Sequence, residues 1–160
     1  MKELERAIEL RESGELEEAK FLLLDILQIE PENSSVWYQY AWVHDVLGRE
    51  REAIPYYKRA LELGLAEEEK QGALLGLGST YRTLGMFKES KAVFEEAIKE
   101  FPEQREYSVF LAMVEYNLKE YSNAMEILLK QLAETSNDKG IQSYKKAILY
   151  YSDKLDQLWD

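Results

Sequence analysis

The feature that most constrains this chain is a stretch of 34 residues, 71–104, in which two amphipathic patterns flank Gly85. Small and apolar residues recur on both sides of Gly85 at steps of three and four, as on one face of a helix. Gly85 suits the left-handed conformation that ends a helix, and Pro102 cannot continue one. The stretch therefore predicts two helices joined by a tight turn. The residues that carry the pattern are Leu74, Leu77, Gly78, Tyr81, Ser90, Phe94 and Ala97.

The pattern recurs along the rest of the chain, which predicts helix pairs over residues of about 1–33, 34–67, 71–104 and 105–138. The second copy is strong, with Gly48 in its turn and Gly64 at its end. Pro55 is tolerated only near the start of a helix, so we expect that helix to begin close to Arg51 or Glu52. Each pair is too thin to bury its own apolar side, so we expect the four to stack in series.

The first and last copies depart from the pattern in ways that suit the ends of such a stack. In the first copy, Glu3 and Arg6 stand where apolar residues are expected, which is typical of an end repeat with a polar outer face. In the fourth copy, Lys119 replaces the turn glycine while the apolar spacing survives.

The last segment, about 139–159, predicts a single capping helix. Ser136, Asn137 and Asp138 form a helix-start signal, and apolar residues then recur at steps of three and four. A lone amphipathic helix of this kind is typical of the cap that covers the last face of a repeat stack. The stripe consists of Ile141, Tyr144, Ile148, Tyr151, Leu155 and Leu158.

The 34-residue unit resembles the tetratricopeptide repeat, whose pattern is matched by Leu77, Gly78, Tyr81, Phe94, Ala97 and Pro102. Leu74 stands where that family often has Trp, and Ser90 where it prefers Ala. The resemblance implies an all-α fold: a right-handed α–α superhelical solenoid of helix pairs with a C-terminal capping helix. It also implies a single domain over residues 1–160.

Composition narrows the classes of partner. The chain carries 20 Lys and Arg against 31 Asp and Glu, a net charge of −11, which argues against nucleic-acid and membrane binding and favours a basic partner. It has no cysteine, so neither a disulfide nor a thiolate zinc site is expected. The first twelve residues are charged throughout, and no apolar run approaches the ~20 residues of a membrane span. We therefore expect a cytoplasmic protein.

The resemblance also implies a binding surface, because in this family the first helix of each pair lines a concave groove. Of the residues placed there, we expect Tyr38, Trp42 and Tyr116 to be exposed, and we place Trp37, Tyr81 and Phe94 in the core. The alternative for each groove aromatic is packing between repeats. The expected groove residues are Tyr38, Trp42, Asp45, Leu75, Ser79, Arg82, Val109, Phe110, Met113 and Tyr116.

Small residues form a second stripe, Gly72, Gly76, Ser79 and Thr83, on one predicted helix. A glycine inside a helix costs about 1 kcal/mol relative to alanine, so its presence needs a compensating contact. The stripe is either a floor on which a ligand backbone approaches closely or room for Trp42 or Phe110 from a neighbouring repeat.

Searching for reactive chemistry gives no catalytic, metal or cofactor site. His44 is the only histidine and takes the place of Tyr81 in the second repeat, where a packed, hydrogen-bonded role is expected. The places where some tetratricopeptide modules carry a carboxylate clamp of Lys and Asn hold other residues, so an acidic chaperone tail is not expected as ligand. Those places hold Tyr38, Gln39, Leu75, Gly76, Val109 and Phe110.

Two functions remain open. The first is a non-catalytic adaptor or scaffold that binds an apolar or amphipathic peptide segment of another protein in its groove. The second is homo-oligomeric assembly through the end faces or the C-terminal helix, where Tyr144, Tyr150, Tyr151 and Trp159 exceed what one cap needs. An enzyme is the third and weakest hypothesis, since no paired acids with an amide stand out.

Overall fold

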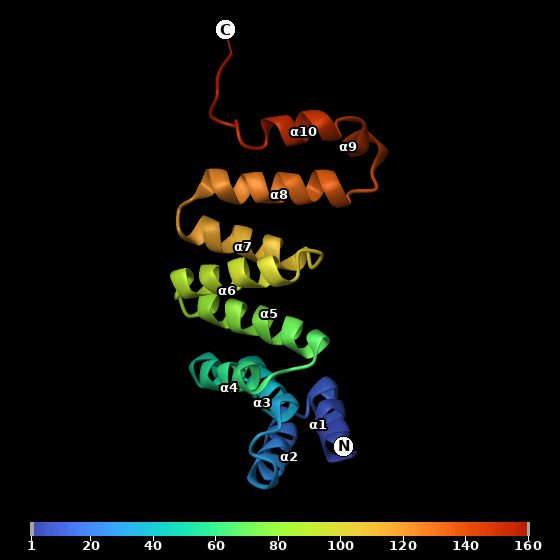
Figure 1. The fold of residues 1–160 in the computed structure, drawn as a ribbon, viewed down its shortest axis with the longest axis vertical. Helices are drawn as coiled ribbons and strands as arrows, with labels where there is room; N and C mark the ends of the chain where they lie inside the picture. Colours follow the sequence, from blue (N-terminus) through green and yellow to red (C-terminus); the bar gives the residue numbers. More distant parts are fainter. Residues whose placement is uncertain (1, 160) are drawn as a thin grey trace. The chain divides into compact units, whose positions relative to one another are not determined.

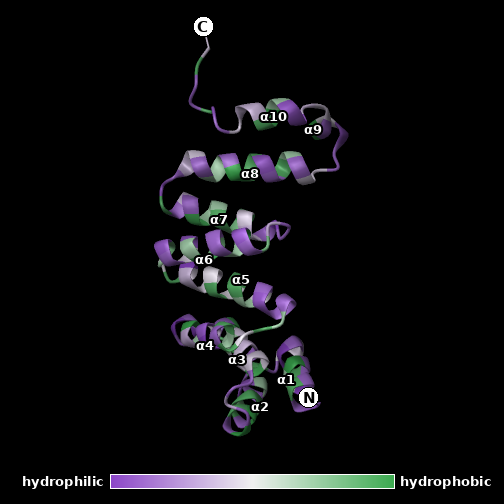
Figure 2. Ribbon diagram, in the orientation of Figure 1, coloured by the Kyte–Doolittle hydropathy of each residue, from purple (hydrophilic) through white to green (hydrophobic). Residues whose placement is uncertain are grey.

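The computed structural model describes residues 2–159, and within them every regular element is a helix (Figure 1), which confirms the all-α fold. Hydrophobic and hydrophilic stretches alternate along most of the helices, as amphipathic packing requires (Figure 2). The helices are α1 (Lys2–Ser13), α2 (Leu16–Ile29), α3 (Ser34–Val46), α4 (Glu50–Leu63), α5 (Glu67–Thr83), α6 (Phe87–Glu100), α7 (Glu106–Asn117), α8 (Tyr121–Thr135), α9 (Lys139–Ser143) and α10 (Lys145–Tyr151).

Consecutive helices pack in pairs: α1 on α2, α3 on α4 and α7 on α8. In the α5–α6 pair, the Ser90 hydroxyl donates a hydrogen bond of 2.7 Å to the Gly78 carbonyl, so these two small residues do mark a close helix approach. Gly85 turns the chain between α5 and α6 with φ 74°, as its left-handed role predicts. At the matching turn between α7 and α8, Lys119 adopts the same conformation with φ 67°.

The chain forms two compact units, Met1–Val93 and Phe94–Asp160. In the first unit, two buried clusters join successive helix pairs. One places Leu23 and Leu27 of α2 against Val36 and Tyr40 of α3. The other places Tyr57 of α4 among residues of α5, and its buried members are Tyr38, Ala41, Ala53, Tyr57, Ala60, Ala73, Leu77 and Tyr81.

The second unit has its own core between α7, α8 and the end of α6. Phe94 is fully buried and its ring lies 5.8 Å from that of Phe110. Tyr81 and Phe94 are therefore core residues, as predicted. Trp37 is only half-buried: its ring stacks on Tyr56 and its indole N–H donates to the Pro31 carbonyl at 2.8 Å.

Helix α4 begins at Glu50, one residue before the predicted start, and continues through Pro55. Pro55 is the sixth residue of the helix, one turn further in than the position where proline is well tolerated. Its side chain is exposed, so its ring displaces no core residue.

The predicted single helix over 141–159 is wrong. Asp138 does cap a helix start, with its side chain accepting from the Ile141 N–H at 2.9 Å, but α9 ends at Ser143 and α10 ends at Tyr151. At the end of α9 the Ser143 hydroxyl donates to the Lys139 carbonyl, and just after α10 the Ser152 hydroxyl donates to the Leu149 carbonyl. Such local bonds compete with helix continuation. The segment contains two short helices followed by turns.

Candidate functional site

The first helices of the pairs in the first unit lie beside one another, with α3 contacting both α1 and α5. This arrangement gives the unit one face made of first helices, here called the α1–α3–α5 face. It carries six of the predicted groove residues, namely Tyr38, Trp42, Asp45, Leu75, Ser79 and Arg82. The other predicted groove residues lie on α7 in the second unit.

Tyr38 is not an exposed groove residue, which corrects the prediction. It is 7% exposed, and its ring packs at 5.7 Å from Trp42 and 6.4 Å from Tyr57. Burial raises the pKa of its hydroxyl. Tyr38 therefore supports the face from beneath, whereas Trp42, like Trp37 on the same helix, stays partly exposed.

Arg11 of α1 covers Trp42, and the sequence interpretation missed it. Its guanidinium carbon lies 3.7 Å from the centre of the Trp42 ring, close enough for a cation–π contact. The Arg11 Nε donates to the Gln39 side-chain oxygen at 3.1 Å, which fixes the guanidinium over the ring. A signal was present: Arg11 lies 34 residues before Asp45, at the matching place in the first repeat.

Asp45 lies one turn beyond Trp42 and is half-buried. Its Oδ2 accepts from the Thr80 hydroxyl at 2.9 Å and lies 3.4 Å from the Tyr57 hydroxyl. Burial raises the pKa of the Asp45 carboxyl, and these two hydrogen bonds oppose that shift only in part. The carboxylate thus brings negative charge to the α1–α3–α5 face and holds α3, α4 and α5 together.

The glycines of α5 make room for tyrosines of the preceding repeat. A Cβ on Gly72 would lie 2.2 Å from the Tyr38 hydroxyl oxygen, and one on Gly76 would lie 2.6 Å from the Tyr57 Cζ. Both distances are too short for real atoms, so alanine does not fit without movement. Of the two interpretations of this stripe, packing holds for the glycines, but the partners are Tyr38 and Tyr57 and neither Trp42 nor Phe110.

The remaining groove residues of α5, Leu75, Ser79 and Arg82, are half-buried. On α7, Val109, Phe110 and Met113 are also half-buried, whereas Tyr116 is 63% exposed, as predicted. The Tyr116 ring meets the Tyr121 ring edge-on at 5.2 Å. The Phe94 ring packs beside the Phe110 ring, so contact between helices covers part of the Phe110 side chain.

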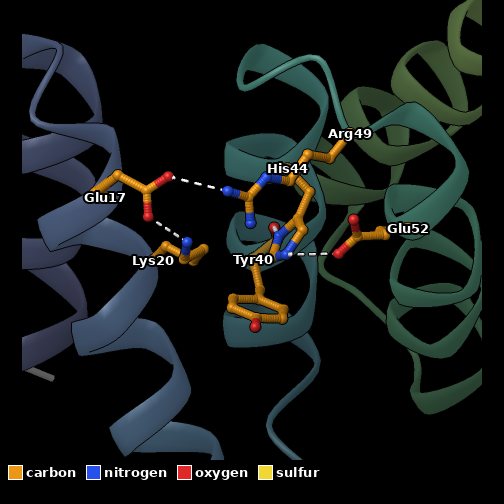
Figure 3. A network of polar contacts seen from close by, with 6 residues as sticks. All are labelled: Glu17, Lys20, Tyr40, His44, Arg49 and Glu52. Carbon is orange, nitrogen blue, oxygen red and sulfur yellow. Dashed lines mark hydrogen bonds and ion pairs between the residues drawn. The ribbon is translucent and has the colours of Figure 1, made fainter.

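His44 has the packed, hydrogen-bonded role that was predicted. It is buried, and its Nδ1 donates to the Tyr40 carbonyl at 2.8 Å, while its Nε2 lies 3.8 Å from a Glu52 carboxylate oxygen (Figure 3). Burial lowers the pKa of its imidazole. Nearby, Glu17 pairs with Arg49 at 3.2 Å and with Lys20, an ion-pair link between α2 and the start of α4.

Among residues 2–159 no cluster of His, Asp and Glu side chains is arranged to hold a metal ion. None of the helices in that range combines the length and apolar character needed to cross a membrane.

Comparison with protein families decides the affiliation. A sequence model described as Tetratrico peptide repeat matches residues 34–155. The chain belongs to the tetratricopeptide repeat family. None of the curated proteins matches the chain at a significant level.

Solved tetratricopeptide-like structures share the fold. A structure described as MamA RS-1 ArsTM double mutant superposes with a TM-score of 0.74 at 15% identity, covering 95% of this chain and 84% of that one. PilF of Pseudomonas aeruginosa gives 0.71 at 21% identity, with 92% and 66% covered. A tetratricopeptide repeat protein from Parabacteroides merdae gives 0.74 at 20% identity, with 94% and 59% covered. This chain therefore spans less than two thirds of the length of the last two.

The tetratricopeptide fold is that of a protein–protein interaction module, and the family is generally non-catalytic. The α1–α3–α5 face gives this tetratricopeptide protein a half-exposed tryptophan, a stacked guanidinium and a half-buried carboxylate within one compact unit.

Proposed function

We propose that this protein is a non-catalytic cytoplasmic adaptor that binds an apolar or amphipathic peptide segment of another protein on the α1–α3–α5 face. The single observation that carries the proposal is Trp42, half-exposed on this face and held by Tyr38 below and Arg11 above. A rigid aromatic side chain beside charged groups is typical of the anchor residues that dominate protein interfaces.

The charges on this face indicate how the peptide is oriented. Asp45 offers a carboxylate to a basic or N–H group of the peptide, and the chain's net charge of −11 steers basic segments toward it. Apolar side chains of the peptide then contact the part of the Trp42 side chain that Tyr38 and Arg11 leave exposed. On α7 of the second unit, Phe110, Met113 and Tyr116 occupy the matching register, and we propose them as binding residues of that unit by itself.

Affinity capture followed by mass spectrometry tests this proposal, with wild type beside Trp42→Ala. The partner captured by wild type is then titrated as a peptide, and Trp42→Ala is expected to weaken its binding more than tenfold, as truncation of an anchor residue does. Circular dichroism checks that the helices persist. Binding unchanged in Trp42→Ala removes the α1–α3–α5 face from the proposal.

Phe21→Ala is the matched control. Phe21 is an aromatic residue of α2, 61% exposed, and it takes part in neither buried cluster of the first unit. Its truncation removes comparable aromatic surface while leaving Trp42, Arg11 and Asp45 intact. Equal losses in Phe21→Ala and Trp42→Ala would mean that the captured partner recognises exposed aromatic surface in general.

A second candidate function is self-association, because the C-terminal segment exposes several large apolar side chains. Tyr144, Tyr150, Tyr151 and Leu158 are each about half-exposed or more. Contiguous apolar surface of this kind marks interaction sites on soluble proteins. Light scattering over a concentration series tests it: a mass that rises above the monomer supports assembly, and a monomeric mass at high concentration excludes it.

A further inference from the structure

The second helices of the four pairs differ at one place in the repeat. Leu23, Tyr57 and Phe94 occupy the same register position on α2, α4 and α6, and they are 0%, 2% and 0% exposed. Leu128, the matching residue of α8, is 40% exposed. The position that is buried in three repeats is therefore open in the fourth.

Leu128 belongs to a continuous stripe. Tyr121, Met125, Leu128 and Leu132 follow one another at steps of four, three and four along α8, and all four are exposed. We call these four residues the α8 seam. Apolar residues at alternating steps of three and four form the contact line of paired helices. Hydrophobic stretches along α8 are visible in Figure 2.

The first unit shows what covers the equivalent surface. On α2, Leu23 and Leu27 lie against Val36 and Tyr40 of the next first helix, α3. On α4, Tyr57 lies against Ala73 and Leu77 of α5. In each case the seam of a second helix packs on the apolar side of another helix. Within the second unit α10 packs on α8, yet it leaves all four seam residues exposed.

We propose that the α8 seam is a homodimer interface in which two copies of the chain pair their α8 helices antiparallel about a two-fold axis. Antiparallel pairing places Tyr121 opposite Leu132 of the second copy and Met125 opposite Leu128. The proposal rests on the self-association candidate above, and it places the interface on α8 in place of the C-terminal segment.

Charge at the seam favours a second copy as the occupant. The positions that flank the contact line hold Ala124 and Gln131 on one side and Ser122 and Leu129 on the other, all uncharged. In a chain of which 32% is charged, these four positions of α8 bring no charge of their own to the interface, and Asp156, whose carboxylate accepts from the Ser122 hydroxyl at 3.2 Å, lies at one edge of it. Two-fold contacts are self-complementary by construction and close after two copies.

Open head-to-tail stacking is disfavoured by the charge on the first helix. The places on α1 that match Ala73 and Leu77 of α5 hold Lys2 and Arg6, and both are exposed. A second copy that offered α1 to the α8 seam would bury two cations against apolar side chains, and burying unpaired charges is strongly unfavourable. The closed pair of α8 helices buries none.

Sedimentation velocity over a concentration series tests the interface on wild type, Leu128→Glu and the control Phe21→Glu, whose side chain is 61% exposed on α2. We expect wild type and Phe21→Glu to dimerise alike, and the dimer dissociation constant of Leu128→Glu to be at least tenfold higher. A Leu128→Glu variant that dimerises like wild type overturns the seam and leaves self-association standing. A wild type that stays monomeric overturns both, whereas the Trp42 peptide proposal is untouched by either result.

Cysteine cross-linking checks the geometry without relying on a charged substitution, because the chain has no native cysteine. A mixture of Met125→Cys and Leu128→Cys proteins is expected to form the mixed disulfide under mild oxidation. Phe21→Cys is expected to stay uncross-linked at the same concentration. Mixed cross-linking no faster than that of Phe21→Cys contradicts the antiparallel pairing.

Discussion

At the scale of single residues, Lys119 carries backbone strain that the other turns avoid. Gly14, Gly48 and Gly85 sit at the matching turns with positive φ, whereas Lys119 must place a Cβ in the same left-handed region. Lys119→Gly is expected to raise the free energy of unfolding by ~1 kcal/mol, the usual cost of a side chain in that conformation. Urea denaturation measures the change. An unchanged or lowered midpoint would show that the lysine side chain compensates the strain.

His44 gives the protein a pH dependence with a definite sign. Burial lowers its pKa, so the unfolded chain, in which histidine titrates near 6.5, binds a proton at a higher pH than the folded one. This contribution to stability is complete above about pH 6.5 and is lost as the pH falls from there toward the folded pKa. The thermal midpoint should therefore decline between pH 7 and 5.5.

His44→Gln is the variant that assigns this decline. It removes the only histidine of the chain, the side chain whose ordinary pKa lies in that interval, so the thermal midpoint of the variant should depend less on pH even though it is lower overall. A decline of the same steepness in the variant would place the titrating group elsewhere.

At the scale of elements, Pro55 is a local conflict that the fold overrides. Helix α4 continues through it because Ala53, Tyr57 and Ala60 are buried on both sides of it. Pro55→Ala is expected to raise stability by roughly 2 kcal/mol, since an alanine N–H restores a helix hydrogen bond, less the entropy that proline removes from the unfolded chain. Chemical denaturation measures this. Because Pro55 is exposed, little packing is lost, and a decrease would point to a contact of the ring.

The elements themselves were largely predictable, with one instructive failure. Signals such as Gly85 in a turn and Leu77 at helical spacing depend only on residues nearby in the sequence. The structure has helices at both places, α5 and α6, with Gly85 between them. The stripe from Ile141 to Leu158 has the same spacing but did not give one helix. There, side-chain bonds from Ser143 and Ser152 to backbone carbonyls interrupt the run, and periodicity carries no information about them.

At the scale of the whole molecule, charge opposes association while the α8 seam favours it. Two copies that each carry −11 repel one another through solvent, and salt screens that repulsion without weakening the apolar contact. Dimerisation is therefore expected to strengthen as NaCl rises from 50 to 500 mM. Sedimentation at both salt concentrations measures this, and weaker association at high salt would indicate an interface held by ion pairs.

The single-domain organisation over residues 1–160 stays a prediction.

For the candidate site, the sequence predicted which residues lie on the first helices of the repeats, but it did not predict how deeply each side chain is buried. The repeat register placed Trp42, Asp45 and Ser79 on first helices, and they lie on helices of the α1–α3–α5 face. Trp37 and Tyr38, by contrast, are neighbours on one helix. The register placed Trp37 in the core and Tyr38 on the exposed side, but Tyr38 is the more deeply buried of the two. Arg11 was missed because the groove register was applied only to the second, third and fourth copies and was not extended to the first.

The sequence by itself determined the helices, their pairing and the family, because spacing, turn glycines and caps act over a few residues. Only the tertiary structure decided which aromatic side chains stay exposed. That choice depends on neighbours far along the chain: Gly72 admits Tyr38 to the interior, Arg11 covers Trp42, and α10 leaves the α8 seam open. Burial is a property of what packs against a residue, and no local pattern contains it.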